Sequence, residues 1–195
     1  MRRFGPLVVP LAALCALSVL ASGACTPLPD PVHDQAVERL GAEPPIGPGA
    51  LHRPGQPCGT CHGASGPAET DFSVAGTIFA GPGSLVGVEG ALVELIDAAG
   101  TSPPAASGVV TNCVGNFWVR RSSWNPVFPV RVVVSRGETH RPMNSEIGRA
   151  ASCADCHAKA VADPFVQTGP VTLFASADPA GPPQKCPVDP NAGAQ

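Results

Sequence analysis

The chain has 195 residues, with 12 Lys and Arg against 15 Asp and Glu, and a formal net charge of −3. This length suits one ordinary domain or two small ones, and the lack of a basic excess argues against nucleic acid as a partner. There are 22 glycines and 24 prolines, and only 14% of residues are charged, which disfavours long helices. The eight cysteines stand out, because so many need disulfides or a bound metal to explain them.

The first residues predict an export signal at 1–24. Two arginines precede an apolar stretch, Leu7–Ala21, and small residues follow it, as a signal peptidase prefers. The stretch is about 15 residues long, shorter than the roughly 20 that span a bilayer, so we expect cleavage. Residues 21–25, Ala-Ser-Gly-Ala-Cys, resemble the bacterial lipobox, although Ser22 stands where Leu is usual. We therefore predict an exported protein, either periplasmic or anchored to the membrane at the cell envelope through a lipid on Cys25.

Cys15 would leave with the signal peptide, so seven cysteines remain. Four of these occur in two copies of one pattern, at residues 58–62 (Cys-Gly-Thr-Cys-His) and 153–157 (Cys-Ala-Asp-Cys-His). This pattern is the attachment signature of c-type haem. The two thiols form thioethers with the vinyl groups of one haem, and the adjacent histidine ligates the iron. The sequence therefore predicts two covalently attached haem c groups, held by Cys58, Cys61, Cys153 and Cys156, with proximal iron ligands His62 and His157.

Two other interpretations of these cysteines are weaker. A Cys₄ zinc site would combine both pairs, but their separation lies well outside the compact spacing of a zinc ribbon, and the adjacent histidines would have no role. A thioredoxin-like redox dithiol would need a neighbouring βαβ pattern, which the sequence lacks. Covalent haem explains both the spacing and the histidines.

Cys113 and Cys186 remain once Cys25 is assigned to lipid. Outside the cytoplasm thiols are oxidised unless another group claims them, so we predict a Cys113–Cys186 disulfide. It would close a loop of about 70 residues and contribute roughly 4 kcal/mol through loop entropy. The bond would fasten the Pro-rich tail at 179–195, whose composition is otherwise typical of disorder.

Between the two motifs, short segments rich in β-branched residues and bounded by turns predict strands. Their spacing is typical of an antiparallel sandwich. The predicted strands are Phe72–Phe79, Ala91–Ile96, Gly115–Val119 and Phe128–Val134, with Val171–Phe174 as a candidate last strand. The expected fold is thus mainly β, a small antiparallel β-sandwich flanked by two haem-binding segments with short helices.

Two short helices are expected beside the haem motifs. Pro31, after the N-cap residue Asp30, begins the first, which runs to Leu40. Asn144 or Ser145 caps the second, which would carry the second haem motif. The predicted organisation is a signal peptide at 1–24, a segment with the first motif at 25–71, the sandwich core at 72–137, the second motif with the final strand at 138–178, and the tail at 179–195.

Few side chains can fill the second axial position of each iron. His52, in a Pro- and Gly-rich loop before the first motif, is a candidate for either haem, with a solvated loop histidine as the alternative. His140 and Met143 precede the second motif, and we expect one of them, with Met143 favoured slightly, to face a haem. His33 is more simply an exposed helix residue. A methionine ligand would raise the reduction potential relative to two imidazoles.

Six arginines fall between residues 120 and 149 against two glutamates, a local excess of four positive charges in an acidic mature protein. Such a patch could pair haem propionates or dock an acidic redox partner, or it could be a solvated strand face. The arginines are Arg120, Arg121, Arg131, Arg136, Arg141 and Arg149.

The order of these signals resembles known families. The carboxypeptidase-regulatory, transthyretin-like β-sandwich is similar over roughly residues 72 to 137, through the segments 74–78, 87–93, 97–100, 111–117 and 129–132 with Gly137. In that family the module is a scaffold or adhesive unit without a catalytic residue. With the flanking haem motifs, nearly the whole mature chain resembles small exported dihaem c-type cytochromes.

These observations predict a dihaem c-type cytochrome that transfers electrons at the cell envelope, a carrier rather than a catalyst. Its partners would be redox proteins and, through the lipid anchor, the membrane. Two alternatives stay open: a β-sandwich envelope lipoprotein with a binding or sensing role, and a small haem peroxidase. Six-coordinate, low-spin haems would favour the cytochrome, and an open coordination position would favour the peroxidase.

Overall fold

The computed structural model describes residues 30–104, 109–149, 152–157, 168–175 and 186. The predicted signal peptide at 1–24, Cys25 and the tail at 179–195, apart from Cys186, lie outside these residues. The chain divides into two units, Met1–Val32 and His33–Gln195. Of the first unit, the structure describes only residues 30–32, where the first helix begins.

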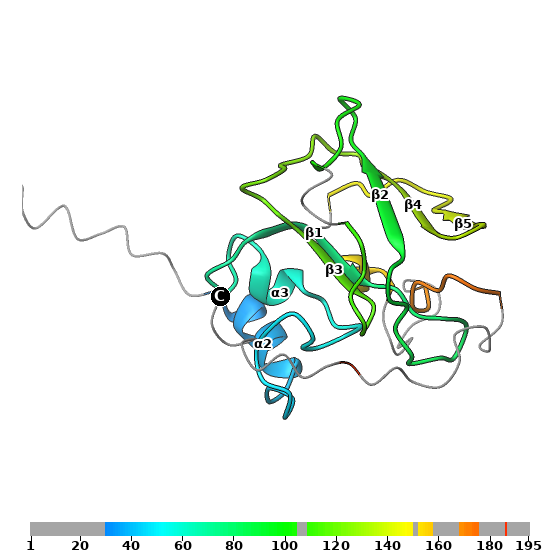
Figure 1. Ribbon diagram of the computed structural model, residues 1–195. Helices are drawn as coiled ribbons and strands as arrows, with labels where there is room; N and C mark the ends of the chain where they lie inside the picture. The colour runs from blue at the N-terminus through cyan, green and yellow to red at the C-terminus, as the bar shows by residue number, and fades with distance from the viewer. Residues whose placement is uncertain (1–29, 105–108, 150–151, 158–167, 176–185, 187–195) are drawn as a thin grey trace, which may run out of the picture. The chain divides into compact units, whose positions relative to one another are not determined.

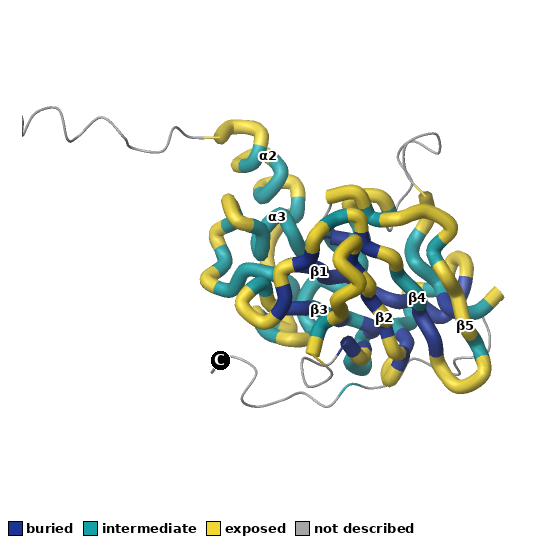
Figure 2. Tube along the Cα trace, turned by 90° about the horizontal axis from the view of Figure 1, so that it is seen from above, coloured by how far each residue is buried: buried dark blue, intermediate teal, exposed yellow. Residues whose placement is uncertain are grey.

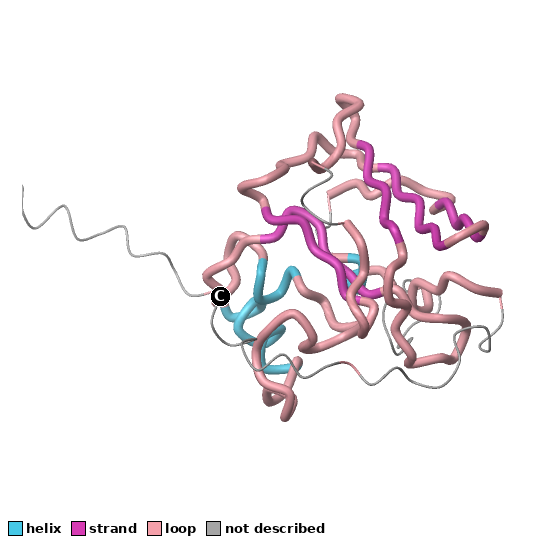
Figure 3. Tube along the Cα trace, viewed as in Figure 1, coloured by secondary structure: helices cyan, strands magenta, loops and turns pink. Residues whose placement is uncertain are grey.

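The described elements are short and are joined by long loops (Figures 1 and 3). Five strands form two antiparallel sheets, β1–β3 and β2–β4–β5. In chain order the elements are α2 (Pro31–Arg39), α3 (Gly59–His62), β1 (Phe72–Thr77), β2 (Leu92–Ile96), β3 (Asn116–Arg120), β4 (Arg131–Arg136), β5 (Thr139–Pro142) and a 3-10 turn, η2 (Cys153–Asp155). The mainly β fold predicted from the sequence is confirmed.

The two sheets share one hydrophobic core, as in a β-sandwich. Val74 and Phe117 from the first sheet belong to the same buried cluster as Val93, Leu95 and Val134 from the second. Along β2, buried and exposed residues alternate, which is the period of two expected of a strand with one face in the core. Figure 2 shows the buried residues concentrated along β1 to β4.

The four predicted strands between the motifs are present, with shifted bounds. Val171–Phe174 forms an isolated parallel bridge with Phe79 rather than a strand, and the Phe79 N–H donates to Val171 O at 2.9 Å. The sheet β2–β4–β5 also contains β5, Thr-His-Arg-Pro, which was not predicted because this segment is polar and mostly exposed. It forms a hairpin with β4 across Gly137, whose φ of 58° suits a tight turn.

The first predicted helix is confirmed as α2. The Asp30 side chain caps it by accepting the Val32 N–H at 3.0 Å, and Gly41, at φ 71°, follows its end. Among the described residues, no helix is long and apolar enough to cross a membrane.

The second predicted helix is wrong over the residues that the structure describes. Ile147 forms an antiparallel bridge with Val130, and Ser152 is extended and bridges Ala75 of β1. Only Cys153–Asp155 turns, as a single 3-10 turn. Tertiary backbone pairing with the sandwich therefore overrides the helix propensity of this alanine-rich segment.

Candidate functional site

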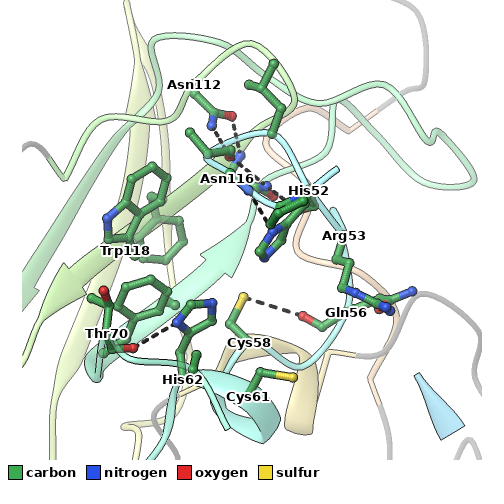
Figure 4. A pocket seen from close by; sticks show the side chains of 18 of the residues that line it. His52, Arg53, Gln56, Cys58, Cys61, His62, Thr70, Asn112, Asn116 and Trp118 are labelled. Atoms are coloured by element: carbon green, nitrogen blue, oxygen red, sulfur yellow. Dashed lines mark hydrogen bonds between the residues drawn. The ribbon is translucent and has the colours of Figure 1, made fainter. Parts of the chain in front are cut away.

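A cavity of about 810 Å³ lies between the loop segments that precede β1 and the sheet β1–β3 (Figure 4). This volume is in the range of small-molecule and cofactor sites, about 300–1,000 Å³. The first cysteine motif, a histidine loop and three aromatic side chains contribute to its wall: Cys58, Cys61, His62, His52, Arg53, Phe72, Phe117 and Trp118.

The first motif forms α3, and its one turn brings the motif's side chains to the cavity. The His62 N–H donates to Cys58 O at 2.8 Å, which closes the turn. The ring nitrogen Nδ1 of His62 lies 2.8 Å from Thr70 O. A carbonyl oxygen only accepts, so Nδ1 carries the proton and Nε2 keeps its lone pair. Metal-ligating histidines have this second hydrogen bond in nearly all proteins, because it fixes the tautomer and the ring.

His62 is also held by an aromatic stack. Its ring lies 4.1 Å from the Phe72 ring, nearly parallel at 12°, and Phe72 in turn lies 6.0 Å from Trp118 (centroid distances). Phe72 and Trp118 belong to β1 and β3, so the sandwich itself orients the motif histidine.

His52 lies across the cavity from His62, with 5.9 Å between their ring centroids (Figure 4). The two imidazole planes are stacked at an interplanar angle of 28°. Burial lowers the pKa of His52, against an opposing effect of Glu43, and so favours the neutral imidazole that a ligand must be. Of the candidate second ligands, His52 is the one that the structure places beside the first motif.

The loop that carries His52 is hydrogen-bonded to the sandwich. Asn116 of β3 donates from Nδ2 to His52 O at 3.0 Å, and Asn112 donates to Ala50 O at 2.7 Å. Thr77 of β1 donates to the Asn116 side-chain oxygen at 2.7 Å and accepts the Gly55 N–H at 2.8 Å. These three polar residues were not predicted from the sequence. The nearest sequence signal is the position of Thr77 and Asn116 at the end of β1 and the start of β3, where a polar side chain is common.

The second motif forms a 3-10 turn instead of an α-helical one, but its histidine makes hydrogen bonds like those of His62. The His157 N–H donates to Cys153 O at 2.7 Å, and its ring Nδ1 lies 3.0 Å from Gly169 O. Thr168 Oγ1 is also 2.9 Å from Nδ1. The His157 ring therefore carries its proton on Nδ1, as the His62 ring does, and its Nε2 keeps the lone pair that a metal would bind.

Both motifs pack close to β1 and to each other. A Cβ atom built on Gly59 of the first motif would lie 3.4 Å from Ser152 Cβ, next to the second motif. Gly76 of β1 lies against Cys153, and a Cβ there would come within 2.7 Å of Cys153 Sγ. The small residues Gly59 and Gly76 thus allow both motifs to pack against β1.

Two of the four motif thiols, Cys58 and Cys153, sit in surroundings that disfavour the thiolate. Burial raises the pKa of Cys58 to about 11 and that of Cys153 to about 12. In the haem-free chain these two side chains are therefore neutral thiols. Within the described ranges, no three His, Cys, Asp or Glu side chains gather as a metal site of the kind that Cys₄ zinc needs.

The other candidate ligands lie elsewhere. His140 is exposed on β5, and Met143 is half-buried, with its N–H donating to Val132 O at 3.0 Å. Neither lines the cavity, and His33 belongs to α2. Their relation to the second motif stays a prediction, since residues 158–167 beside that motif are not described.

The predicted Cys113–Cys186 disulfide is confirmed, with the two Cα atoms 5.6 Å apart. Cys113 also lines the cavity. The arginine-rich region is not uniform: Arg121 pairs with Asp71 at 2.6 Å, and Arg141 donates to Leu173 O, whereas Arg120 lines the cavity.

Comparison with known proteins adds no relative: no protein family, curated protein or solved structure matches the chain.

Proposed function

We propose that this chain is a dihaem c-type cytochrome that carries electrons at the cell envelope. The observation that carries the proposal is the shared setting of His62 and His157. Each follows a Cys-x-x-Cys turn, and each directs Nδ1 to a main-chain carbonyl oxygen, at 2.8 and 3.0 Å. Two independent segments with the same tautomer and the same free Nε2 are what two proximal haem ligands require.

The residues around the first motif fit a haem. The cavity has room for a large planar group, and Phe72, Phe117 and Trp118 give it apolar walls. When bound, each haem would supply a one-electron ferric–ferrous couple. The protein contributes the two thiols, the proximal histidine, and His52 as the proposed second ligand of the first iron. His140 and Met143 stay candidates for the second iron.

The proposed location agrees with the cysteine chemistry. The Cys113–Cys186 disulfide is typical of proteins outside the cytoplasm. On this proposal residues 1–24 direct export, and Cys25 anchors the mature chain through lipid. Redox partner proteins would approach the exposed haem edges, and Arg120, at the cavity, would pair a haem propionate.

The first test is a pyridine haemochrome spectrum combined with intact mass, on protein exported from a host that matures c-type cytochromes. We expect two covalent haems in the wild type and one in C58S/C61S or C153S/C156S. The matched control is C113S/C186S, which also removes two cysteines and should retain both haems. A chain without covalent haem would refute the proposal and leave the β-sandwich lipoprotein as the better interpretation.

A second measurement separates an electron carrier from a peroxidase. Low-spin, six-coordinate spectra for both haems in both oxidation states would support electron transfer, because no position is left for a peroxide. H52A should convert the first haem to high spin, whereas H33A, which changes a histidine outside the cavity, should not. A wild-type protein that is already high-spin and reacts with peroxide would contradict the carrier proposal.

A further inference from the structure

A carboxylate is fixed directly behind His52. Glu43 Oε2 accepts a hydrogen bond from Arg53 Nε at 2.9 Å, while Glu43 Oε1 lies 3.7 Å from His52 Nδ1. The Arg53 side chain is only 14% exposed. Its other nitrogens donate to Leu40 O and Gly41 O, each at 2.8 Å, and to Gln56 Oε1 at 2.9 Å. Arg53 therefore ties the turn after α2 to the histidine loop and holds Glu43 between them.

Ligation would change the hydrogen bond that the His52 ring makes. In the structure Nδ1 of His52 accepts the Gly49 N–H at 3.1 Å, so Nε2 of the neutral ring carries the proton. A neutral imidazole that binds iron through Nε2 must instead carry its proton on Nδ1. The Gly49 N–H cannot accept that proton, whereas Glu43 Oε1 can after a shift of less than about 1 Å, given normal N–H···O distances of about 2.7–3.2 Å.

We propose that Glu43 accepts the Nδ1–H of His52 in the haem-loaded protein and thereby lowers the reduction potential of the first haem. This inference rests on the proposed function. His62 and His157 face neutral carbonyl oxygens, so His52 would be the one histidine of the three with a charged partner. A carboxylate makes the imidazole a stronger donor, which favours the more positive ferric iron. Reduction takes one electron from the mediator or partner protein, breaks no bond, and leaves the proton on His52.

The Glu43–His52 pair also gives electrons a direction. A lower potential at the first haem would favour the second haem as the acceptor, above all if Met143 ligates the second iron, because a methionine ligand raises the potential. The two motifs are neighbours against β1, since Gly59 of the first lies beside Ser152, the residue that precedes the second.

The test is a potentiometric titration of the full, haem-loaded chain followed by visible absorption. The variant E43Q keeps the length of the side chain and an oxygen that can accept from Nδ1, but removes the charge. The matched control is E89Q, because Glu89 lines the same cavity but makes no hydrogen bond or ion pair with His52. E43Q should raise the reduction potential of one haem by at least 59 mV more than E89Q does, which is a tenfold change in the one-electron equilibrium constant. The low-spin spectrum should be unchanged.

A second variant separates contact from charge. E43D keeps the charge but withdraws the carboxylate from His52, so it should also raise the potential of the same haem. It serves equally if E43Q lowers the yield of loaded protein. Equal shifts in E43Q and E89Q, with E43D unchanged, would show a distant charge effect and overturn the inference.

The two proposals fail in distinguishable ways. A chain without covalent haem overturns both. Two covalent haems with a high-spin first haem, unchanged in H52A, would mean that His52 keeps its Gly49 bond and is not a ligand, which overturns the inference alone. Two low-spin haems with no specific effect of Glu43 leave the cytochrome standing and remove the role of the carboxylate.

Discussion

Replacing Gly76 by alanine tests whether the second motif is packed against β1 as described. Gly76 pairs with Phe117 in the sheet β1–β3. The new methyl group would lie 2.7 Å from Cys153 Sγ, 2.8 Å from Cys153 Cβ and 3.0 Å from the edge of the Phe117 ring. Carbon contacts are optimal near 3.5–4.0 Å, so all three are too close, and Cys153 or the strand must move.

The expected cost follows from overpacking, which destabilises a core by about 1–3 kcal/mol. The matched control is G148A, because Gly148 has open space around it and no left-handed φ. Both variants lose a similar amount of unfolded-state entropy, so the difference between them measures the overpacking. For a chain of this size 1 kcal/mol shifts Tm by about 2–4 °C. G76A should therefore melt roughly 2–12 °C below G148A.

Thermal unfolding followed by circular dichroism checks this value, and haem counting checks its consequence. Displacement of Cys153 should lower thioether formation at the second motif while the first motif stays loaded. If G76A melts no lower than G148A and carries two haems, Cys153 does not pack on Gly76, and the placement of the second motif on β1 is wrong.

Three further predictions concern other parts of the site and the core. N116A should release the loop that carries His52 and raise the high-spin fraction of the first haem, as seen in its absorption spectrum, whereas a change confined to Tm would refute a positioning role. In the haem-free, reduced chain at pH 8, iodoacetamide should label the exposed Cys156 first and Cys153 last among the motif cysteines, because burial raises the pKa of Cys153 to about 12. Peptide masses report the order of labelling, and the reverse order would contradict the burial of Cys153. D97N should lower Tm at pH 7, because the carboxylate accepts the Val127 and Thr101 N–H groups, and these bonds lower the pKa of Asp97. That stability is present above the unfolded pKa of about 4 and is lost as pH falls through the lower folded pKa, so the two proteins should converge in acid; a gap that stays constant with pH would refute it.

The sequence predicted the elements whose signals are local. Asp30 and Pro31 marked the start of α2, and alternating β-branched residues marked β1 to β4. The Cys113–Cys186 pairing followed from elimination, since every other cysteine after the signal had a chemical assignment. The motif spacing alone placed each histidine one turn after its first cysteine.

The parts that were missed depend on contacts distant in sequence. The segment around Ile147 and Ser152 has helix propensity, but its backbone forms β-bridges with Val130 and Ala75 instead. The Glu43–Arg53 pair joins residues ten positions apart in a loop without periodicity, so no pattern marks it. Arg53 even adopts a left-handed φ of 49°, which its four hydrogen bonds maintain against steric cost.

The burial pattern links the sandwich to the proposed cofactors. None of residues 41–72 is buried, although this segment contains the first motif and the His52 loop, whereas the sheets hold a complete core of their own. The segment is held mainly by polar contacts, which include the hydrogen bonds from Asn112, Asn116 and Arg53, and by the stacking of His62 on Phe72. A haem in the cavity would add apolar contacts to these. On the proposed function, the sandwich is the scaffold that presents β1 and β3 to the first haem, and the haem would complete the packing of the half-buried motif segment.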